Sequence, residues 1–272
     1  MTERGAHARP AAATPGASKA GDGAANGAVR TARAKLTTHL HVVDTRADGY
    51  HLLDAEMVAL ALADTLTFTD IDASADGELA VSGPWAAGVP TDDRNLVRRA
   101  LARVGRPADV HIVKNIPAGG GLGGGSADAA AALAWAGCTD LAVAASLGAD
   151  VPFCLSGLPR AAVGGIGELL DERPFVARDY TLVLLPFGVD TTAVYRAWDE
   201  LGAPLGARND LQAAAVTIEP RLVRWRDRIA EAAGIVPTLA GSGSTWFLDG
   251  AHPDLGQRLP GATVVVTRTD RP

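Results

Sequence analysis

The first regular pattern of apolar and polar positions along the chain predicts a strand. Over residues 32–44 apolar side chains alternate with polar ones, and Leu36, Leu40 and Val42 fall in step. Such alternation is typical of a strand with one buried face. We therefore expect ordered structure to begin at Ala32.

Helix and strand signals then alternate through the rest of the first half. Residues 92–105 have the apolar spacing of an amphipathic helix, with Asp92 or Asp93 near its start. The other predicted elements are a turn at 46–53, one or two strands at 56–71, a Gly/Pro-rich connection at 76–90, a strand at 109–116, a glycine loop followed by an alanine-rich helix at 117–137, and a short helix, a turn and a buried segment at 141–155.

The second half predicts a separate α+β unit, with the boundary between the units near 157–165. Its predicted elements are a strand at 181–187, a helix at 191–201, one or two helices at 209–234, a strand, glycine loop and strand at 237–250, and a closing strand at 263–269.

The first 30 residues are rich in Ala, Gly and Pro and have no periodic apolar face. This composition predicts a disordered tail. Because the tail bears arginines and few acids, a transit peptide is possible in principle, but Pro10, Pro15 and the repeated glycines favour an ordinary solvated tail. The apolar core of a secretory signal peptide is absent from it.

Charge and cysteine content exclude several classes of protein. The formal net charge is −6, and the first 34 residues hold five basic and two acidic side chains, so the remainder carries −9. An acidic body argues against a general nucleic-acid binder. Cys138 and Cys154 cannot make a disulfide framework, which favours a reducing cytoplasm. No apolar run approaches the roughly 18 residues of a membrane span, so we expect no membrane partner.

The most informative segment is the run GGGLGGGSADAA at 119–130, in which six glycines precede a helix-forming sequence. Glycine permits positive φ and close backbone approach, so that consecutive N–H groups can line an anion site. The following helix adds free N–H groups and the positive end of its dipole. Ser126 or Asp128 is a candidate N-cap, and Ser126 is also a candidate contact for a phosphate or its metal ion.

Three other interpretations of this run are weaker. The Walker A pattern occurs nowhere in the chain, and the acidic residue of a dinucleotide fingerprint does not follow at the required spacing. A flexible linker seldom lies between a strand and a strong helix. The run therefore predicts phosphate binding.

The segment PAGGGLGGGSAD, which starts at Pro117, resembles the central motif of the GHMP kinases, a superfamily that includes galactokinase, homoserine kinase and mevalonate kinase. Five further segments resemble, in order, the branch that acts on a cytidine diphosphate-linked methylerythritol in the non-mevalonate isoprenoid route. These segments are AKL at 34–36, RADGYHLL at 46–53, LGADVPF at 147–153, and NDL at 209–211 with GSGST at 241–245.

The resemblance covers roughly residues 32–270 and implies a two-domain α+β fold. It places an ATP-binding domain of the ribosomal protein S5 domain 2-like type over 31–160, and a ferredoxin-like domain over 161–272. It also implies ATP-dependent phosphorylation of the substrate's 2-hydroxyl, with Mg²⁺ arriving mainly with ATP because the sequence shows no metal-ligand cluster. We expect a small-molecule substrate, no nucleic-acid partner, and a monomer or homodimer.

The resemblance assigns the reaction to two residues. Asp150 matches the catalytic base that accepts the hydroxyl proton, and Lys35 matches the lysine that keeps the aspartate ionised and stabilises the developing charge. From the residues alone, Asp150 is equally well a turn aspartate and Lys35 a surface lysine of a strand.

The resemblance also implies two binding sites. Tyr50 stacks on cytosine, His51 bonds its polar edge, and Tyr195 lies on the second face of the base, although Tyr195 also fits a helix core. Gly241, Ser242 and Gly243 either close on the substrate phosphates or support the first glycine loop. The ATP residues are Asn95 and Lys114 near adenine, with Pro117, Gly119, Gly120, Gly121, Leu122, Gly123, Gly124, Gly125 and Ser126 around the phosphates.

The chain departs from the family pattern in three places. Thr37 stands where the family usually has asparagine, and a hydroxyl replaces only part of the hydrogen bonding of an amide. The segment before LGADVPF is short, and residues 160–168 are a loose version of a family motif. These differences leave two alternatives open, another GHMP small-molecule kinase and a nucleotide-binding paralogue without catalysis. Tyr50 and His51 argue against the first, and Lys35 and Asp150 against the second.

Overall fold

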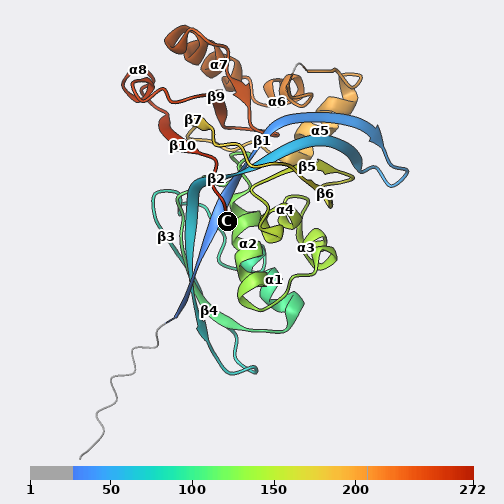
Figure 1. The fold of residues 1–272 in the computed structure, drawn as a ribbon, viewed down its shortest axis with the longest axis vertical. Coiled ribbons are helices and arrows are strands. Elements are labelled where there is room, and N and C mark those ends of the chain that lie inside the picture. The colour runs from blue at the N-terminus through green and yellow to red at the C-terminus, as the bar shows by residue number, and fades with distance from the viewer. Residues whose placement is uncertain (1–26, 207) are drawn as a thin grey trace, which may run out of the picture.

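Two long antiparallel strands form the central element of the fold. A computed structural model describes residues 27–206 and 208–272, and in it β1 (Ala28–Thr45) pairs with β2 (His51–Asp70) along nearly its whole length. Figure 1 shows this pair running from the lower end of the molecule to the hairpin on its upper right. The rest of the first sheet is β3 (Leu79–Ser82), β4 (Ala108–Val113), β5 (Arg160–Gly164) and β6 (Leu169–Glu172), in the order β3-β4-β2-β5-β6.

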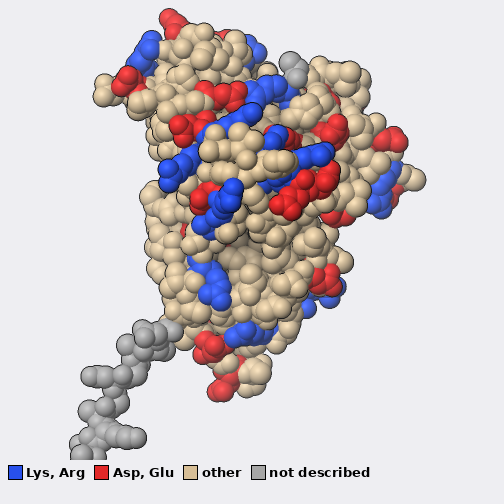
Figure 2. Space-filling view, viewed as in Figure 1, with Lys and Arg blue, Asp and Glu red and all other residues tan. Residues whose placement is uncertain are grey.

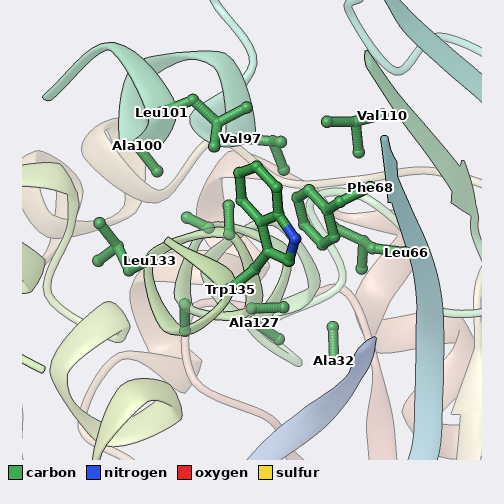
Figure 3. Close-up of a cluster of buried hydrophobic side chains, with 14 of the residues drawn as sticks. Ala32, Leu66, Phe68, Val97, Ala100, Leu101, Val110, Ala127, Leu133 and Trp135 are labelled. Atoms are coloured by element: carbon green, nitrogen blue, oxygen red, sulfur yellow. The ribbon is translucent and has the colours of Figure 1, made fainter. Parts of the chain in front are cut away.

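The first hydrophobic core lies between this sheet and a group of helices. Phe68 of β2 stacks on Trp135, with ring centroids 4.8 Å apart, and Figure 3 shows Val97 and Leu66 beside the two rings. Burial of such large rings is a major source of stability. The helices are α1 (Leu96–Val104), α2 (Gly124–Trp135), α3 (Leu141–Leu147) and α4 (Val151–Ser156).

A second sheet with its own helices makes up the rest of the chain. Its strand order is β10-β7-β9-β8, and all its pairings are antiparallel. The strands are β7 (Asp179–Leu184), β8 (Thr238–Leu239), β9 (Trp246–Asp249) and β10 (Thr263–Arg268), and the helices are α5 (Thr191–Glu200), α6 (Gln212–Ile218), α7 (Arg221–Ala233) and α8 (Leu255–Arg258).

The two sheets share a buried apolar layer. Leu36 of β1 and Leu60 of β2 belong to the same buried cluster as Tyr180, Leu182 and Phe247 of the second sheet. Ile116, before the glycine run, and Leu122, within it, belong to this cluster as well. The first glycine loop is therefore anchored where the two sheets meet.

The structure confirms most predicted elements and corrects several bounds. Strand β1 begins at Ala28 rather than Ala32, because residues 28–33 pair with 63–68 of β2. Of the two alternatives predicted for 56–71, one strand is correct, and it ends at Asp70. Strands β3, β5 and β6 and helix α8 were not expected. Residues 1–26 of the predicted disordered tail lie outside the described residues, and residues 28–30 of it belong to β1.

Two helix starts also differ from the prediction. Helix α1 is capped by Asn95, whose side chain accepts the Val97 N–H, rather than by Asp92 or Asp93. Helix α2 starts at Gly124 after Gly123, so Ser126 and Asp128 lie inside it and neither is its N-cap.

The sheet pairing changes the position expected for the boundary. Strands β5 and β6 lie beyond residue 160 but pair within the first sheet, so the second sheet begins only with β7. The division into two domains at 160 stays a prediction. Within the described ranges, the helices are all too short or too polar to cross a membrane.

Candidate active site

Lys35 and Asp150, which are far apart in the sequence, meet in space. Lys35 is on β1, and Asp150 immediately precedes α4, where Pro152 stands at the start of the helix. The Lys35 Nζ lies 3.1 Å from Asp150 Oδ2, and the Asp150 side chain is 28% exposed. Lys35 Nζ also donates to Thr37 Oγ1 at 3.0 Å. The lysine is thus held on the buried side of a carboxylate that remains open to a ligand.

The first glycine loop, residues 117–123, connects β4 to α2 and has its carbonyl groups held by other segments. The Leu122 carbonyl accepts from the Lys35 N–H at 3.0 Å, the Gly119 carbonyl from Val189 and Ser244, and the Gly120 carbonyl from Thr245. These bonds fix the backbone of the loop.

The N–H groups at the start of α2 remain available for a ligand. Gly123 caps the helix without a side-chain bond, so Gly124, Gly125 and Ser126 have no partner within the helix for their N–H groups. Gly125 is exposed and Ser126 is half-buried. A helix start of this kind is a binding site for phosphate.

Two of the glycines are required by close contacts rather than by flexibility. Gly121 has φ +77°, and a Cβ there would lie 2.0 Å from the Ala240 carbonyl oxygen. Gly123 has φ +67°, and a Cβ there would lie 2.8 Å from the Lys35 Cγ. The loop therefore packs backbone against backbone on one side and against the catalytic lysine candidate on the other.

The second glycine loop, residues 241–243, supports the first and borders Lys35. A Cβ added at Gly241 would lie 3.9 Å from Lys35 Nζ, and Ser242 Oγ is 2.8 Å from Thr191 Oγ1 at the start of α5. Asn209 Nδ2 donates to the Leu239 and Gly241 carbonyl oxygens at 2.9 and 2.7 Å. The NDL motif thus holds this loop in place.

The residues expected to bind the nucleobase lie at the turn of the β1–β2 hairpin and on α5. Tyr50 is 58% exposed. His51 stacks on Tyr195, with ring centroids 4.8 Å apart, and its Nε2 lies 2.8 Å from Asp199 Oδ1. The stacking partner of Tyr195 is therefore His51 itself, which differs from the expected arrangement in which Tyr195 offers a free face to the base.

Asp150 influences two neighbouring groups electrostatically. Burial, and then the negative charge of Asp150, raises the pKa of the Tyr195 phenol well above its usual range. The same two causes raise the pKa of the Cys154 thiol, one helical turn after Asp150, with Lys35 opposing them. Both groups are therefore neutral at physiological pH.

The side chains of Asn95 and Lys114, which were expected near adenine, are bonded to protein groups. Asn95 caps α1 and donates to the Pro90 carbonyl oxygen at 2.8 Å, which leaves it buried and engaged. Lys114 is 3% exposed in its side chain and is bonded to the buried carboxylates of Asp64 and Asp128. Both side chains therefore have protein partners for their polar atoms, and their place near adenine stays a prediction.

Sequence reasoning missed three residues that position the site. Asp64 was hidden in a largely apolar strand, and as the single charged residue between positions 57 and 69 it is itself a signal of a buried partner. Asn209 was noted only as part of a motif. Asp199 gave no signal, since its partner His51 lies 148 residues away.

The donor set fits a metal ion that arrives with its ligand. Within the ranges 27–206 and 208–272, no group of three or more His, Cys, Asp or Glu side chains could hold a metal ion. Ser126 and Asp150 offer oxygen atoms that are partly accessible. Mg²⁺ commonly takes one or two protein oxygens together with substrate phosphates, so this set is adequate.

The chain is similar to known proteins. Residues 95–157 match the family model described as the GHMP kinases N terminal domain. A 4-diphosphocytidyl-2-C-methyl-D-erythritol kinase of Paracoccus denitrificans (strain Pd 1222) is 36% identical over 236 residues, which cover 79% of this chain and 84% of that protein.

Two solved structures are similar to the chain. The crystal structure of a 4-(cytidine 5'-diphospho)-2C-methyl-D-erythritol kinase has a TM-score of 0.68 and 28% identity, over 89% of this chain and all of the other. A homoserine kinase from Cytophaga hutchinsonii ATCC 33406 has a TM-score of 0.55 and 14% identity, over 88% of this chain and 96% of the other, which is a likeness of fold alone.

Proposed function

The chain belongs to the 4-diphosphocytidyl-2-C-methyl-D-erythritol kinase family, and we propose that Lys35 and Asp150 carry out its phosphoryl transfer. The reaction moves the γ-phosphoryl group of ATP to the 2-hydroxyl of 4-diphosphocytidyl-2-C-methyl-D-erythritol. It belongs to the non-mevalonate route to isoprenoid precursors.

Asp150 acts as the general base. Its accessible carboxylate takes the proton of the acceptor hydroxyl while a bond forms between that oxygen and the γ-phosphorus. The bond from the γ-phosphorus to the bridging oxygen of ADP breaks, and ADP leaves. Asp150 Oδ2 lies 3.1 Å from Lys35 Nζ, so the base is adjacent to a cation that can face the developing charge.

Lys35 and the glycine loops stabilise the charge that develops. The Lys35 ammonium lies between the two loops, next to the acceptor oxygen in our proposal, and Thr37 keeps it oriented. The N–H groups at Gly124, Gly125 and Ser126 receive the ATP phosphates. Ser126 would hold Mg²⁺ together with those phosphates, and the bound ion would neutralise phosphate charge.

The cytidine end of the substrate binds at the β1–β2 hairpin. Tyr50 offers an exposed ring for stacking, and the His51 imidazole offers a hydrogen-bonding edge. Tyr195 stacks on the His51 ring and so fixes its orientation. This arrangement suits a nucleobase better than the small acceptors of other GHMP kinases.

A single observation carries this proposal: Lys35 and Asp150 form an ion pair directly beside a helix start whose N–H groups are free. The free cysteines Cys138 and Cys154 support a cytoplasmic location, in which no disulfide is needed. Oligomeric state is proposed as monomer or homodimer.

An ADP-release assay tests the function. We expect purified protein with Mg²⁺ and ATP to release ADP when the cytidine diphosphate substrate is added, and to do so far more slowly with a sugar or with homoserine. Turnover of a sugar in preference to the cytidine substrate would identify a different GHMP kinase. Nucleotide binding without turnover of any acceptor would identify a non-catalytic paralogue.

A further inference from the structure

A buried charged cluster lies beneath the first glycine loop, and the proposed reaction does not use it. Lys114 Nζ donates to Asp64, and to Asp128 Oδ2 at 2.6 Å. All three side chains are at most 5% exposed. We call these three residues the Lys114 cluster.

The cluster joins the two ends of the loop. Asp64 Oδ1 accepts from the backbone N–H groups of Asn115 and Ile116, the residues that lead from β4 into the loop. Asp128 belongs to the second turn of α2, the helix that leaves the loop. Among the hydrogen bonds of the described residues, only Lys114 donates to both carboxylates. It therefore connects the residues that enter the loop to the helix that follows it.

Close packing places the cluster directly against the start of α2. A Cβ added at Gly124 would lie 3.3 Å from Lys114 Nζ and 2.9 Å from Ile116 Cγ2. Asp128 Oδ1 is buried and has no hydrogen-bond partner among the described residues. A buried cluster in which one oxygen has no partner is costly to maintain, which argues for a purpose beyond stability.

We propose that Lys114 is the positioning residue of the phosphate site. By binding both Asp64 and Asp128, it fixes the end of β4 relative to the first turns of α2. The N–H groups of Gly124, Gly125 and Ser126 are thereby oriented toward the same phosphate-binding position. The inference rests on the proposed function of this loop in binding ATP phosphates, and it deepens that function by assigning the residues that preorganise it.

Direct contact of Lys114 with adenine would have a different consequence. A positioning role acts on the phosphates, because only they meet the N–H groups of α2. An adenine contact acts on the nucleoside, with or without phosphates. The two roles therefore separate when the affinity for a non-hydrolysable ATP analogue is compared with the affinity for adenosine.

The test uses Asp128→Ala and Lys114→Gln in the full-length protein, with calorimetric binding of both probes. We expect each variant to bind the ATP analogue at least about tenfold more weakly while the affinity for adenosine changes less than about twofold, a tenfold change being about 1.4 kcal/mol. In steady-state assays KM for ATP should rise and KM for the acceptor should stay unchanged. Asp128→Asn, which keeps an oxygen facing Lys114, should restore most of the affinity for the ATP analogue.

Glu56→Gln is the matched control, because it weakens another ion pair of the same sheet, with Arg160 at 2.6 Å, away from the loop. It should lower the melting temperature without changing either affinity. Equal loss of adenosine and ATP-analogue binding in the cluster variants would overturn the proposal, as would a lower melting temperature with both affinities intact. If Asp128→Ala does not fold, Lys114→Gln decides alone. Neither probe involves the acceptor, so failure of the proposed acceptor chemistry appears separately, in the ADP-release assay.

Discussion

At the scale of single residues, the chemistry depends on one carboxylate that is both paired and accessible. Asp150 is bound to Lys35 on one side and open on the other. By contrast, Asp140 caps α3, and Asp92 forms an exposed ion pair with Arg94. The pairing keeps a proton acceptor ready, and the open side admits the hydroxyl that supplies the proton.

Asp150→Asn should lower kcat by about 10²- to 10⁴-fold, the usual contribution of a general base. Binding of an ATP analogue should be retained, because the loop amides are untouched. The coupled ADP-release assay measures the first quantity and calorimetry the second. The matched control is Asp140→Asn ten residues earlier, where asparagine caps α3 as well as aspartate does. If Asp150→Asn turns over as fast as wild type, the base has been assigned wrongly.

Asp128 makes a pH-dependent contribution to stability. Burial, opposed by Lys114 and reinforced by Asp64, raises the pKa of Asp128 above its ordinary value of 3.8. Between that value and the raised one, the folded protein keeps a proton that the unfolded chain releases. The free energy of unfolding therefore falls as pH rises through this window.

The variant Asp128→Asn cannot titrate and isolates this contribution. We expect the free energy of unfolding of wild type, measured in urea relative to Asp128→Asn, to decline from about pH 4 upward. The Lys114 and Asp64 charges and the Cys154 thiol face the same site and are common to both proteins. A difference that stays flat or grows with pH would contradict the assigned direction.

At the scale of elements, the site is built where two glycine loops touch. Residues 119–123 come from the first sheet's β4–α2 connection and residues 240–243 from the second sheet's β8–β9 connection. Without side chains, the two backbones approach closely enough for direct hydrogen bonds, such as Thr245 N–H to the Gly120 carbonyl at 3.2 Å. Glycine therefore serves here for contact more than for flexibility.

Comparison of Gly121→Ala with Gly137→Ala separates the effect of contact between the two loops from the effect of a positive φ. Both glycines have positive φ, +77° and +81°, but a Cβ at Gly121 meets the Ala240 carbonyl whereas one at Gly137 meets nothing within 4 Å. Gly137→Ala should cost about 1–2 kcal/mol of stability, the cost of a left-handed alanine.

Gly121→Ala should cost more and should also weaken ATP binding, because the loops must move apart. Denaturant unfolding and calorimetric binding of an ATP analogue measure the two effects. Equal losses in the two variants, with ATP binding unchanged in both, would show that contact between the loops is unimportant.

At the scale of the whole molecule, the two sheets share one apolar layer, to which the long β1–β2 pair of the first sheet contributes side chains. Trp135 lies in the first core and Trp246 in the second. Because the layer formed by Leu36, Leu60 and Phe247 joins the sheets, we expect them to unfold together.

Variants that retain a single tryptophan, at position 135 or 246, test this expectation by fluorescence during urea unfolding. The two probes should report the same midpoint and the same dependence on urea. Two separated transitions would show that the sheets behave as independent domains and that the shared layer contributes little to cooperativity.

Charge at this scale does not explain the capture of an anionic substrate. The formal net charge is −6, and on the face shown in Figure 2 acidic and basic side chains are intermingled. Attraction therefore depends on a few local groups, namely the loop N–H groups and Lys35. This is consistent with a site in which backbone geometry matters more than overall charge.

Local sequence was sufficient for the elements and for the phosphate loop. Alternation over 32–44, the helical spacing at 92–105 and the glycine run before α2 each depend on neighbours within a few residues, and the structure contains all three elements. The errors fell at their ends, as at Ala28 and Asn95, because strand pairing and capping geometry decide where an element stops.

Only the tertiary structure decided which groups meet. Lys35 pairs with Asp150, Lys114 with Asp64 and Asp128, and the two glycine loops with each other, across separations that no local pattern encodes. Lys114 illustrates the difference. From the sequence it could be a charged residue at the end of a strand, but in the structure it is buried between two carboxylates and links two elements. The physical reason is that a charged side chain takes its role from its partners and its exposure to water, and folding supplies both.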